Sequence, residues 1–267
     1  MVIIAALAIS KAKHVHFPAP VGSGCAVHGA RFAVTLDTSQ ASIAATIAGV
    51  ATHRALPTRA VTIAYAAALQ ESDLENLSYG DRDSVGVFQQ RPSEGWGTRR
   101  QLLDPVYASS RFFVALTAVP HYEQIRVYKA AQAVQHSADG LAYDQYAPQG
   151  ADMAWAFSGQ RSRAVWCWYG AGIGGHSRLS AAGTQLRRTF GRLTIRHAGD
   201  PVARVRVRRP TVGWAVAAWL VSHASRFNIR QVRYQGYQWT AAQGRRGWIA
   251  RPRQRHATAA RSGVTFG

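Results

Sequence analysis

The stretch Ala60-Val-Thr-Ile-Ala-Tyr-Ala-Ala-Ala-Leu-Gln-Glu71-Ser72 is an apolar run that ends in a carboxylate and a hydroxyl. Pro57 precedes it and suits the first turn of a helix, so the sequence predicts a helix over about residues 57 to 70. Small alanine side chains let neighbouring helices approach closely. We therefore expect this helix at the centre of the core, followed by a polar loop rich in glycine and aspartate.

Glu71 is the candidate catalytic residue. A carboxylate at the edge of a core helix is partly desolvated, and desolvation disfavours the charged form, so such a group can keep a proton and act as a general acid. It also faces the unfavourable end of the helix dipole, which is a cost to the fold. The alternative is a helix that merely ends in an acidic residue.

Three motifs follow one another around this position: Glu71-Ser72, then Tyr79-Gly-Asp-Arg-Asp-Ser-Val-Gly-Val-Phe-Gln89, then Gly95-Trp-Gly-Thr98. Together they resemble the active-site region of goose-type lysozymes and of the related soluble lytic transglycosylases, and the resemblance covers about residues 40 to 158. In those families a Glu-Ser pair at a helix end precedes a Gly-aliphatic-Met-Gln segment that lines the sugar cleft.

The segment Gly86-Val87-Phe88-Gln89 takes the place of that lining segment, with Phe88 where the families have methionine. The resemblance implies a mainly α, lysozyme-like domain of the α+β class. It also implies cleavage of the glycan strands of peptidoglycan, in which Glu71 protonates the glycosidic oxygen as an oxocarbenium-like transition state forms.

The second chemical step depends on whether another carboxylate takes part. Asp81 stands where the goose-type Gly-Asp-Arg pattern has its aspartate and, with Asp83, is a candidate to position water for hydrolysis. Without such a group, the muramyl C6 hydroxyl attacks internally, Glu71 acts as acid and then as base, and the product is a 1,6-anhydro sugar. The alternative for both aspartates is turn capping, which is routine for this residue type.

Eight residues are expected to bind the substrate: Ser72, Gly86, Val87, Phe88, Gln89, Gln90, Trp96 and Tyr143. Ser72 would orient Glu71 or contact the sugar, and the glutamines would hydrogen-bond acetamido groups, unless Gln90 lies in a solvated loop. Tyr143, which with Tyr146 resembles the tyrosine of a later family motif, would stack on a sugar or hydrogen-bond Glu71, unless it is a core aromatic. Trp96 would be a sugar platform or a loop anchor.

The net charge of +19 is placed very unevenly along the 267 residues. Residues 1–158 contain 12 Lys and Arg against 12 Asp and Glu, whereas residues 159–267 contain 20 Arg, no Lys and the single acid Asp200. Such a basic segment is drawn to polyanions, so we expect it to bind an anionic wall polymer or a membrane surface. A coding bias towards arginine explains the choice of Arg over Lys, but not the near absence of acids.

Two further function classes compete with glycan cleavage. A lysozyme-like scaffold can bind glycan without cutting it, while the basic part holds the wall or membrane. Nucleic-acid binding through the Arg-rich part, with its interleaved Trp and Tyr, ranks third because it makes no use of the Glu71 region. The substitution Glu71→Gln separates an enzyme from a binder. The sequence does not specify the oligomeric state.

The only two cysteines, Cys25 and Cys167, flank the expected catalytic domain. In an exported protein they permit one disulfide, and in a cytosolic protein they are more often free thiols. The ten histidines show no metal-binding spacing, and neither cysteine stands in a nucleophile motif. The sequence therefore predicts no metal and no cofactor.

The N-terminus begins with an apolar run, Met1-Val-Ile-Ile-Ala-Ala-Leu-Ala-Ile9, followed by Lys11 and Lys13. The run is shorter than the ~20 residues of a spanning helix and lacks the basic start of a signal peptide. We interpret it as the tail of a membrane or signal anchor whose beginning is missing, which places the protein in the cell envelope outside the cytoplasm. The alternative is an ordinary buried segment.

Composition divides the chain into four parts. These are a truncated anchor and linker over 1–36, the lysozyme-like catalytic domain over 37–158, an Arg- and Gly-rich linker over 159–210, and a small basic α/β module over 211–267. The last part resembles the small C-terminal module of some actinobacterial envelope proteins.

Local patterns predict the elements within these parts. Helices are expected after Asp37, after Asp104-Pro105, and over about 127–136 and 140–157, because apolar residues recur there with helical spacing. Residues 72–98 are expected to form turns and a small hairpin, since they lack that spacing and are rich in glycine. Arg204-Val-Arg-Val-Arg208 alternates like an exposed strand, and a helix and two strands are expected after Thr211.

Overall fold

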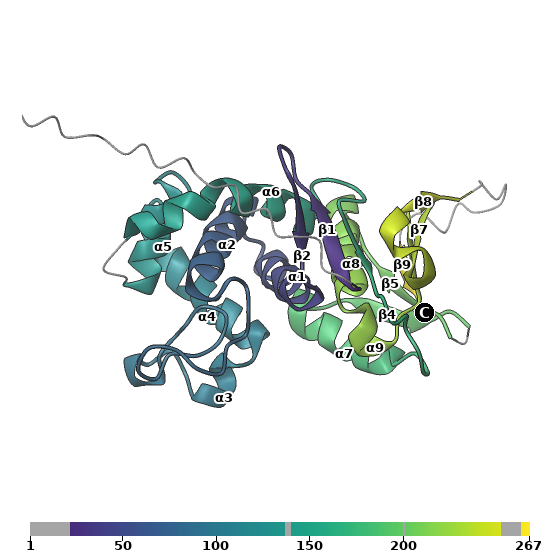
Figure 1. Cartoon of the computed structure of the whole chain (residues 1–267), viewed down its shortest axis with the longest axis horizontal. Helices are drawn as coiled ribbons and strands as arrows, with labels where there is room; N and C mark the ends of the chain where they lie inside the picture. The colour runs from purple at the N-terminus through teal and green to yellow at the C-terminus, as the bar shows by residue number, and fades with distance from the viewer. Residues whose placement is uncertain (1–21, 137–139, 200, 252–262) are drawn as a thin grey trace, which may run out of the picture.

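The computed structural model describes residues 22–136, 140–199, 201–251 and 263–267 (Figure 1). The chain mixes helices and sheets, in agreement with the α+β class expected from the sequence. Figure 1 shows helices gathered at one end of the molecule and a sheet at the other, with two strands from the N-terminal part between them.

The helical end is built from five helices that the sequence pattern predicted. They are α1 (Thr38–His53), α2 (Thr58–Ser72), α4 (Pro105–Ala118), α5 (Val127–Gln135) and α6 (Ala147–Phe157). Helix α2 is buried continuously from Ala60 to Leu69 and packs on α6. The approach is close because α6 has Gly150 at the crossing, where an added Cβ would lie 3.1 Å from the Thr62 carbonyl oxygen.

Short elements complete this end of the molecule. They are the 3₁₀ turns η1 (Pro92–Glu94) and η2 (Gly140–Tyr146) and the one-turn helix α3 (Arg99–Leu102). The small hairpin expected within residues 72–98 is reduced to a single antiparallel bridge between Val85 and Gln90. The rest of that segment forms turns, as expected from its glycines.

A three-stranded antiparallel sheet corrects the expected linker within the described residues 22–36. Its strands are β1 (Gly24–His28), β2 (Ala33–Leu36) and β3 (Val165–Trp168), in the order β2-β1-β3. The side chain of Asp152 on α6 fastens the β1–β2 turn, because its two oxygens accept the backbone N–H groups of residues 30, 31 and 32 at 3.0–3.2 Å.

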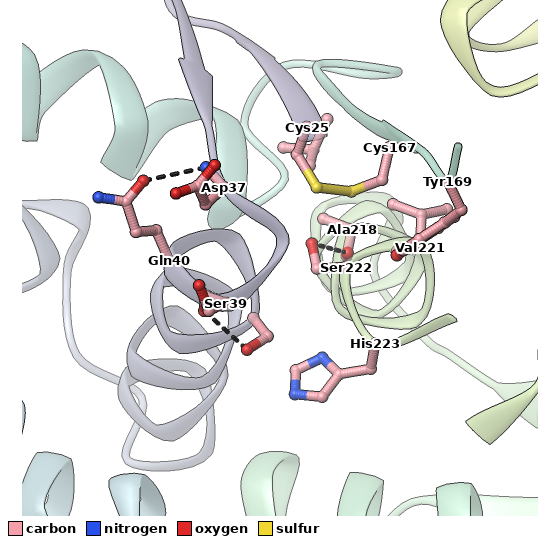
Figure 2. Close-up of a disulfide and its surroundings, with 12 residues drawn as sticks. Cys25, Asp37, Ser39, Gln40, Cys167, Tyr169, Ala218, Val221, Ser222 and His223 are labelled. Atoms are coloured by element: carbon pink, nitrogen blue, oxygen red, sulfur yellow. Dashed lines mark hydrogen bonds between the residues drawn. A yellow bond between two sulfur atoms is a disulfide. The ribbon is translucent and has the colours of Figure 1, made fainter. Parts of the chain in front are cut away.

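Cys25 of β1 is paired in register with Cys167 of β3, and a disulfide joins them across 142 residues of sequence. Figure 2 shows this bridge facing the C-terminal half of α8 (Pro210–Ser222). Beside it, the Tyr169 hydroxyl donates to the Val221 carbonyl at 2.6 Å. Of the two cysteine states left open by the sequence, the structure has the disulfide.

The second expected linker, residues 159–210, is also ordered where the structure describes it. It contains β3, helix α7 (Leu179–Phe190) and the strands β4 (Thr194–His197) and β5 (Ala203–Arg206). Strand β5 agrees with the predicted Arg204–Arg208 strand, with Ala203 and Val205 buried and the arginines exposed. The linker prediction was wrong because high arginine and glycine content was taken for absence of structure, although only one face of these elements needs to be apolar.

The C-terminal part adds a six-stranded antiparallel sheet in the order β4-β5-β9-β6-β7-β8. Its remaining elements are β6 (Gln231–Tyr234), β7 (Tyr237–Thr240), β8 (Ile249–Ala250), β9 (Gly263–Phe266), α9 (Ala224–Phe227) and η3 (Ala241–Arg246). The predicted helix and two strands after Thr211 correspond to α8, β6 and β7. Helix α8 is almost wholly buried and packs on α1 on one side and on β3, β6 and β9 on others, so it joins the sheet to the helices.

Among the helices of the described residues, none has the length and apolar character that crossing a membrane requires. The apolar run that the sequence analysis interpreted as an anchor, Met1–Ile9, lies outside the described residues.

Candidate active site

Glu71 lies in the last turn of α2 and is half-buried. The hydroxyl of Tyr143 donates a hydrogen bond to Glu71 Oε1 at 2.6 Å. Tyr143 comes from η2, 72 residues further along the chain, and is only 1% exposed. The predicted hydrogen bond from this tyrosine to Glu71 is therefore present in the structure. The ring of Tyr143 is also part of the core, so both alternatives describe it.

The chain turns sharply straight after Glu71. Asp73 and Leu74 both adopt left-handed backbone conformations, with φ of 52° and 60°. The Asp73 N–H donates to the Leu69 carbonyl at 3.1 Å, which is the bond of an αL helix cap, and the Leu74 N–H donates to the Ala68 carbonyl, also at 3.1 Å. Because Leu74 is fully buried, this turn is anchored in the core and fixes the place where Glu71 leaves the helix.

Ser72 connects the helix end to the segment of residues 86–90. Its hydroxyl is buried and donates to the Val87 carbonyl at 2.7 Å, with the Ala68 carbonyl 3.1 Å away. A second bond holds the same segment, since the Gln135 side-chain amide of α5 donates to the Phe88 carbonyl at 2.8 Å. Ser72 is therefore a positioning residue that holds the loop against α2.

The side chains of Val87 and Phe88 are both 0% exposed and belong to the core. The Phe88 ring stacks on Phe112 of α4, with centroids 4.5 Å apart. The sequence analysis placed both residues among those that bind substrate. Because both side chains are buried, the prediction that they contact the substrate directly is wrong. They support the loop from its core side.

The local backbone of the loop explains why residue 86 is a glycine. Its φ is +82°, and a Cβ at this position would lie 2.4 Å from the Leu102 carbonyl oxygen. No other residue type fits this backbone conformation and this close approach without a shift of the loop.

The two glutamines that follow differ from each other. The Gln89 side-chain amide donates to the carbonyls of Tyr79 and Gly86 at 3.3 and 3.1 Å, so it braces the loop internally. Gln90 is 3% exposed, which contradicts the solvated-loop alternative, and its amide N and O have no hydrogen-bond partner among the described residues.

Neither candidate second carboxylate is bonded to Glu71 in the described part of the chain. The Asp81 side chain is 93% exposed, and its nearest charged partner is Arg82 at 4.0 Å. Asp83 accepts hydrogen bonds from the Ser93 N–H at 2.7 Å and from Arg91 Nε at 2.9 Å. The Ser93 N–H first, and then Arg91, lower the pKa of Asp83 to about 2, as befits a turn-capping carboxylate.

Trp96 is half-buried and packs against the core, and its carbonyl accepts a hydrogen bond from the Tyr107 hydroxyl at 3.3 Å. These contacts are those of the loop-anchor alternative. Two further residues near the site were not predicted from the sequence. Tyr79 is a highly exposed aromatic residue on the Gly-Asp-Arg loop, and Gln135 had no local signal because its contact joins two distant segments.

The structure thus brings Glu71, Ser72 and Tyr143 together and leaves Asp81 in solvent. Within the described ranges, no group of three or more His, Cys, Asp or Glu residues is arranged to hold a metal ion. Comparison with models of known protein families and with curated proteins found no match to this chain.

Proposed function

We propose that this protein cleaves the glycan strands of peptidoglycan, with Glu71 as the general acid and base. The observation that carries the proposal is the hydrogen bond from the buried Tyr143 hydroxyl to a half-buried glutamate at a helix end. The order of motifs that resembles lysozymes and lytic transglycosylases supports the same chemistry.

The first step is protonation of the glycosidic oxygen by Glu71. As the bond from the sugar C1 to that oxygen breaks, positive charge develops on the sugar ring and a carboxylate remains on Glu71. A hydrogen bond from Tyr143 to an ionised acceptor is stronger than one to a neutral acceptor, so this contact strengthens as the proton leaves. Tyr143 therefore favours the transition state over the bound substrate.

The second step is proposed to use the muramyl C6 hydroxyl. Glu71 takes the proton of this hydroxyl as its oxygen bonds to C1, which regenerates the acid and yields a 1,6-anhydro sugar. The exposed position of Asp81, which has no bond to Glu71 in the described structure, supports this single-carboxylate route over hydrolysis. Hydrolysis by an inverting mechanism requires a second carboxylate that holds water opposite the acid.

The test is digestion of purified peptidoglycan by the wild-type protein, Glu71→Gln and Asp81→Asn, with the released fragments identified by mass spectrometry. We expect anhydro-muropeptides from the wild type and from Asp81→Asn, and none from Glu71→Gln. Reducing-end sugars that disappear in Asp81→Asn would replace the proposed second step by hydrolysis. Release of fragments by Glu71→Gln would remove Glu71 from the chemistry.

A non-catalytic glycan-binding protein is the second candidate. The observation in its favour is the 93% exposed side chain of Asp81, because it leaves Glu71 without a second carboxylate to hold water for hydrolysis. In this case the wild type and Glu71→Gln bind insoluble peptidoglycan equally in a sedimentation assay, and neither releases fragments.

A further inference from the structure

A cavity of about 250 Å³ opens between the end of β1, the loop before β3 and the loop from η3 to β8. Its main side chains are His28, Arg161, Arg163, Trp166, Arg246 and Trp248. Three guanidinium groups from two distant segments therefore meet around one small space. None of these residues belongs to the candidate active site.

The positive charge in this cavity has no internal counter-charge. Residues 159–199 and 201–267 contain no Asp or Glu. Within the described residues, every ion pair uses an arginine other than Arg161, Arg163 and Arg246. Like charges gathered without counter-ions destabilise a fold, so a cluster of this kind is the arrangement expected where an external anion binds.

Two of the guanidinium groups are held in place by neutral partners. Arg161 donates a hydrogen bond to the Gly29 carbonyl, and the Arg163 guanidinium lies over the Tyr237 ring, 4.3 Å from its centroid. These contacts orient the side chains without neutralising them. The Arg161 charge is also felt by His28, whose pKa is lowered by burial first and then by Arg161, so the histidine is mostly neutral at pH 7.

The walls of the cavity are well supported. The Trp248 indole N–H donates to the Val165 carbonyl at 2.8 Å. The Trp166 ring lies against the His28 ring, 4.6 Å between centroids, and against Gly247, where an added Cβ would come within 3.0 Å of the indole. An anion therefore meets a preformed site and orders few side chains on binding.

A second cavity, of about 540 Å³, adjoins the first and shares Arg246 with it. Arg245 also lines this space and lies over the Trp168 ring, 4.8 Å from its centroid. The Trp168 indole N–H is buried and has no hydrogen-bond partner among the described residues, so it is a further donor available to a ligand. Two neighbouring cationic cavities that share one arginine suit a ligand with repeated anionic groups.

We infer that these two cavities bind successive phosphate groups of a linear polyol-phosphate polymer. Guanidinium groups match phosphate oxygens in geometry and charge. A nucleic acid carries the same phosphates, but its single strands bind through bases stacked on free aromatic faces. Here the rings of Trp166, Trp168 and Tyr237 are already covered by His28, Arg245 and Arg163. This site is independent of glycan cleavage and does not require Glu71 to be catalytic.

The test measures binding of the full chain to poly(glycerol phosphate) by isothermal titration calorimetry at one fixed salt concentration. Arg161→Gln/Arg246→Gln is compared with Arg192→Gln/Arg196→Gln. The second pair removes the same charge from exposed positions at and beside β4, the opposite edge of the sheet from β8. Loss of two charge-assisted bonds should weaken binding by the first variant at least about tenfold. The control pair should change it less than about twofold.

Equal losses in both double variants would overturn the inference, because binding would then follow overall charge. Arg246→Gln alone guards against misfolding, since Arg246 is exposed, whereas Arg161 is bonded to the turn that follows β1. It should weaken binding by itself, with an unchanged melting temperature. A single-stranded oligonucleotide with the same number of phosphates should bind more weakly than the polymer. Tighter binding of the oligonucleotide would replace the polyol polymer by nucleic acid.

Discussion

At the scale of single residues, the site depends on two side chains that the chain brings together from 72 residues apart. The sequence indicated Glu71 because a carboxylate follows an apolar helical run, and the order of the surrounding motifs strengthened that indication. It left the role of Tyr143 open, because burial and hydrogen bonding of a tyrosine depend on tertiary contacts. The structure shows that Tyr143 donates a hydrogen bond to Glu71, and this contact allows the role of the tyrosine to be tested.

Tyr143→Phe tests that role directly. Removing the hydroxyl takes one hydrogen bond from the Glu71 carboxylate, worth roughly 1.5–3 kcal/mol to a charged acceptor. We expect the rate of fragment release from peptidoglycan to fall about 10- to 100-fold, with little change in glycan binding. Tyr146→Phe, in the same 3₁₀ turn but half-buried, is the matched control and should keep nearly full activity. Equal rates for both variants would make the bond purely structural.

His223 gives the molecule a predictable response to acid. The residue is buried against Trp219, with ring centroids 3.9 Å apart, and burial lowers its pKa from 6.5 to about 3. The folded state therefore keeps His223 neutral while the unfolded state takes up a proton below pH 6.5. Stability from this residue is complete above that pH and is lost as the pH falls towards 3.

The measurement is urea unfolding of the wild type and His223→Phe at pH 7.5 and 4.5. The wild type should lose stability between these values, and the variant should lose less, because its aromatic ring stacks without titrating. Asp83, whose pKa is lowered to about 2, changes stability only below about pH 4. It therefore does not contribute to the difference between pH 7.5 and 4.5. A pH dependence unchanged by the substitution would mean that His223 is already protonated in the folded state or exposed in it.

At the scale of elements, local patterns predicted what local forces determine. Apolar residues at helical spacing predicted the five long helices of the N-terminal part, and Arg204-Val-Arg-Val-Arg208 predicted strand β5. Strands β1 and β2 were missed because β1 pairs with β3, about 140 residues further on, and carries no alternating pattern of its own. The loop of residues 86–90 was predicted as a ligand-facing segment, whereas most of its side chains point into the core.

Gly86→Ala tests how tightly that loop is fixed. The substitution needs an unfavourable φ of +82° and pushes a Cβ to 2.4 Å from the Leu102 carbonyl, so we expect a loss of roughly 2 kcal/mol or more in unfolding free energy. Activity should fall as well, because the neighbouring Val87 carbonyl accepts the hydrogen bond by which Ser72 holds the loop. Gly95→Ala is the matched control. It has a similar φ of +77° but no atom within 4 Å of the new Cβ, so only the backbone cost of about 1 kcal/mol remains.

Urea unfolding of both variants gives the two free energies, and their difference isolates the close approach to Leu102. If the two glycines cost the same, the loop has room to move away from α3. In that event the loop of residues 86–90 is less rigid than its hydrogen bonds to Ser72 and Gln135 suggest.

At the scale of the whole molecule, α8 connects the helical and sheet ends, and the disulfide beside it joins β1 to β3 (Figure 2). The bridge closes a loop that contains the entire helical part, because Cys25 and Cys167 are 142 residues apart. Cross-linking such distant positions removes conformational entropy from the unfolded chain, by roughly 4–5 kcal/mol in the chain-entropy model. The disulfide can form because β1 pairs with β3 in the folded chain and places the two cysteines opposite each other. The sequence alone does not show this pairing, so it left both cysteine states open.

Cys25→Ser/Cys167→Ser should therefore lower the unfolding free energy by up to roughly 5 kcal/mol, and a thiol reductant should lower that of the wild type by a similar amount. Urea unfolding with and without reductant measures both, and the reductant should leave the double variant unchanged. Glu71 and Tyr143 lie inside the closed loop, so fragment release should survive wherever the variant is still folded. A stable variant that has lost activity would mean that the disulfide between β1 and β3 is needed to order the candidate active site.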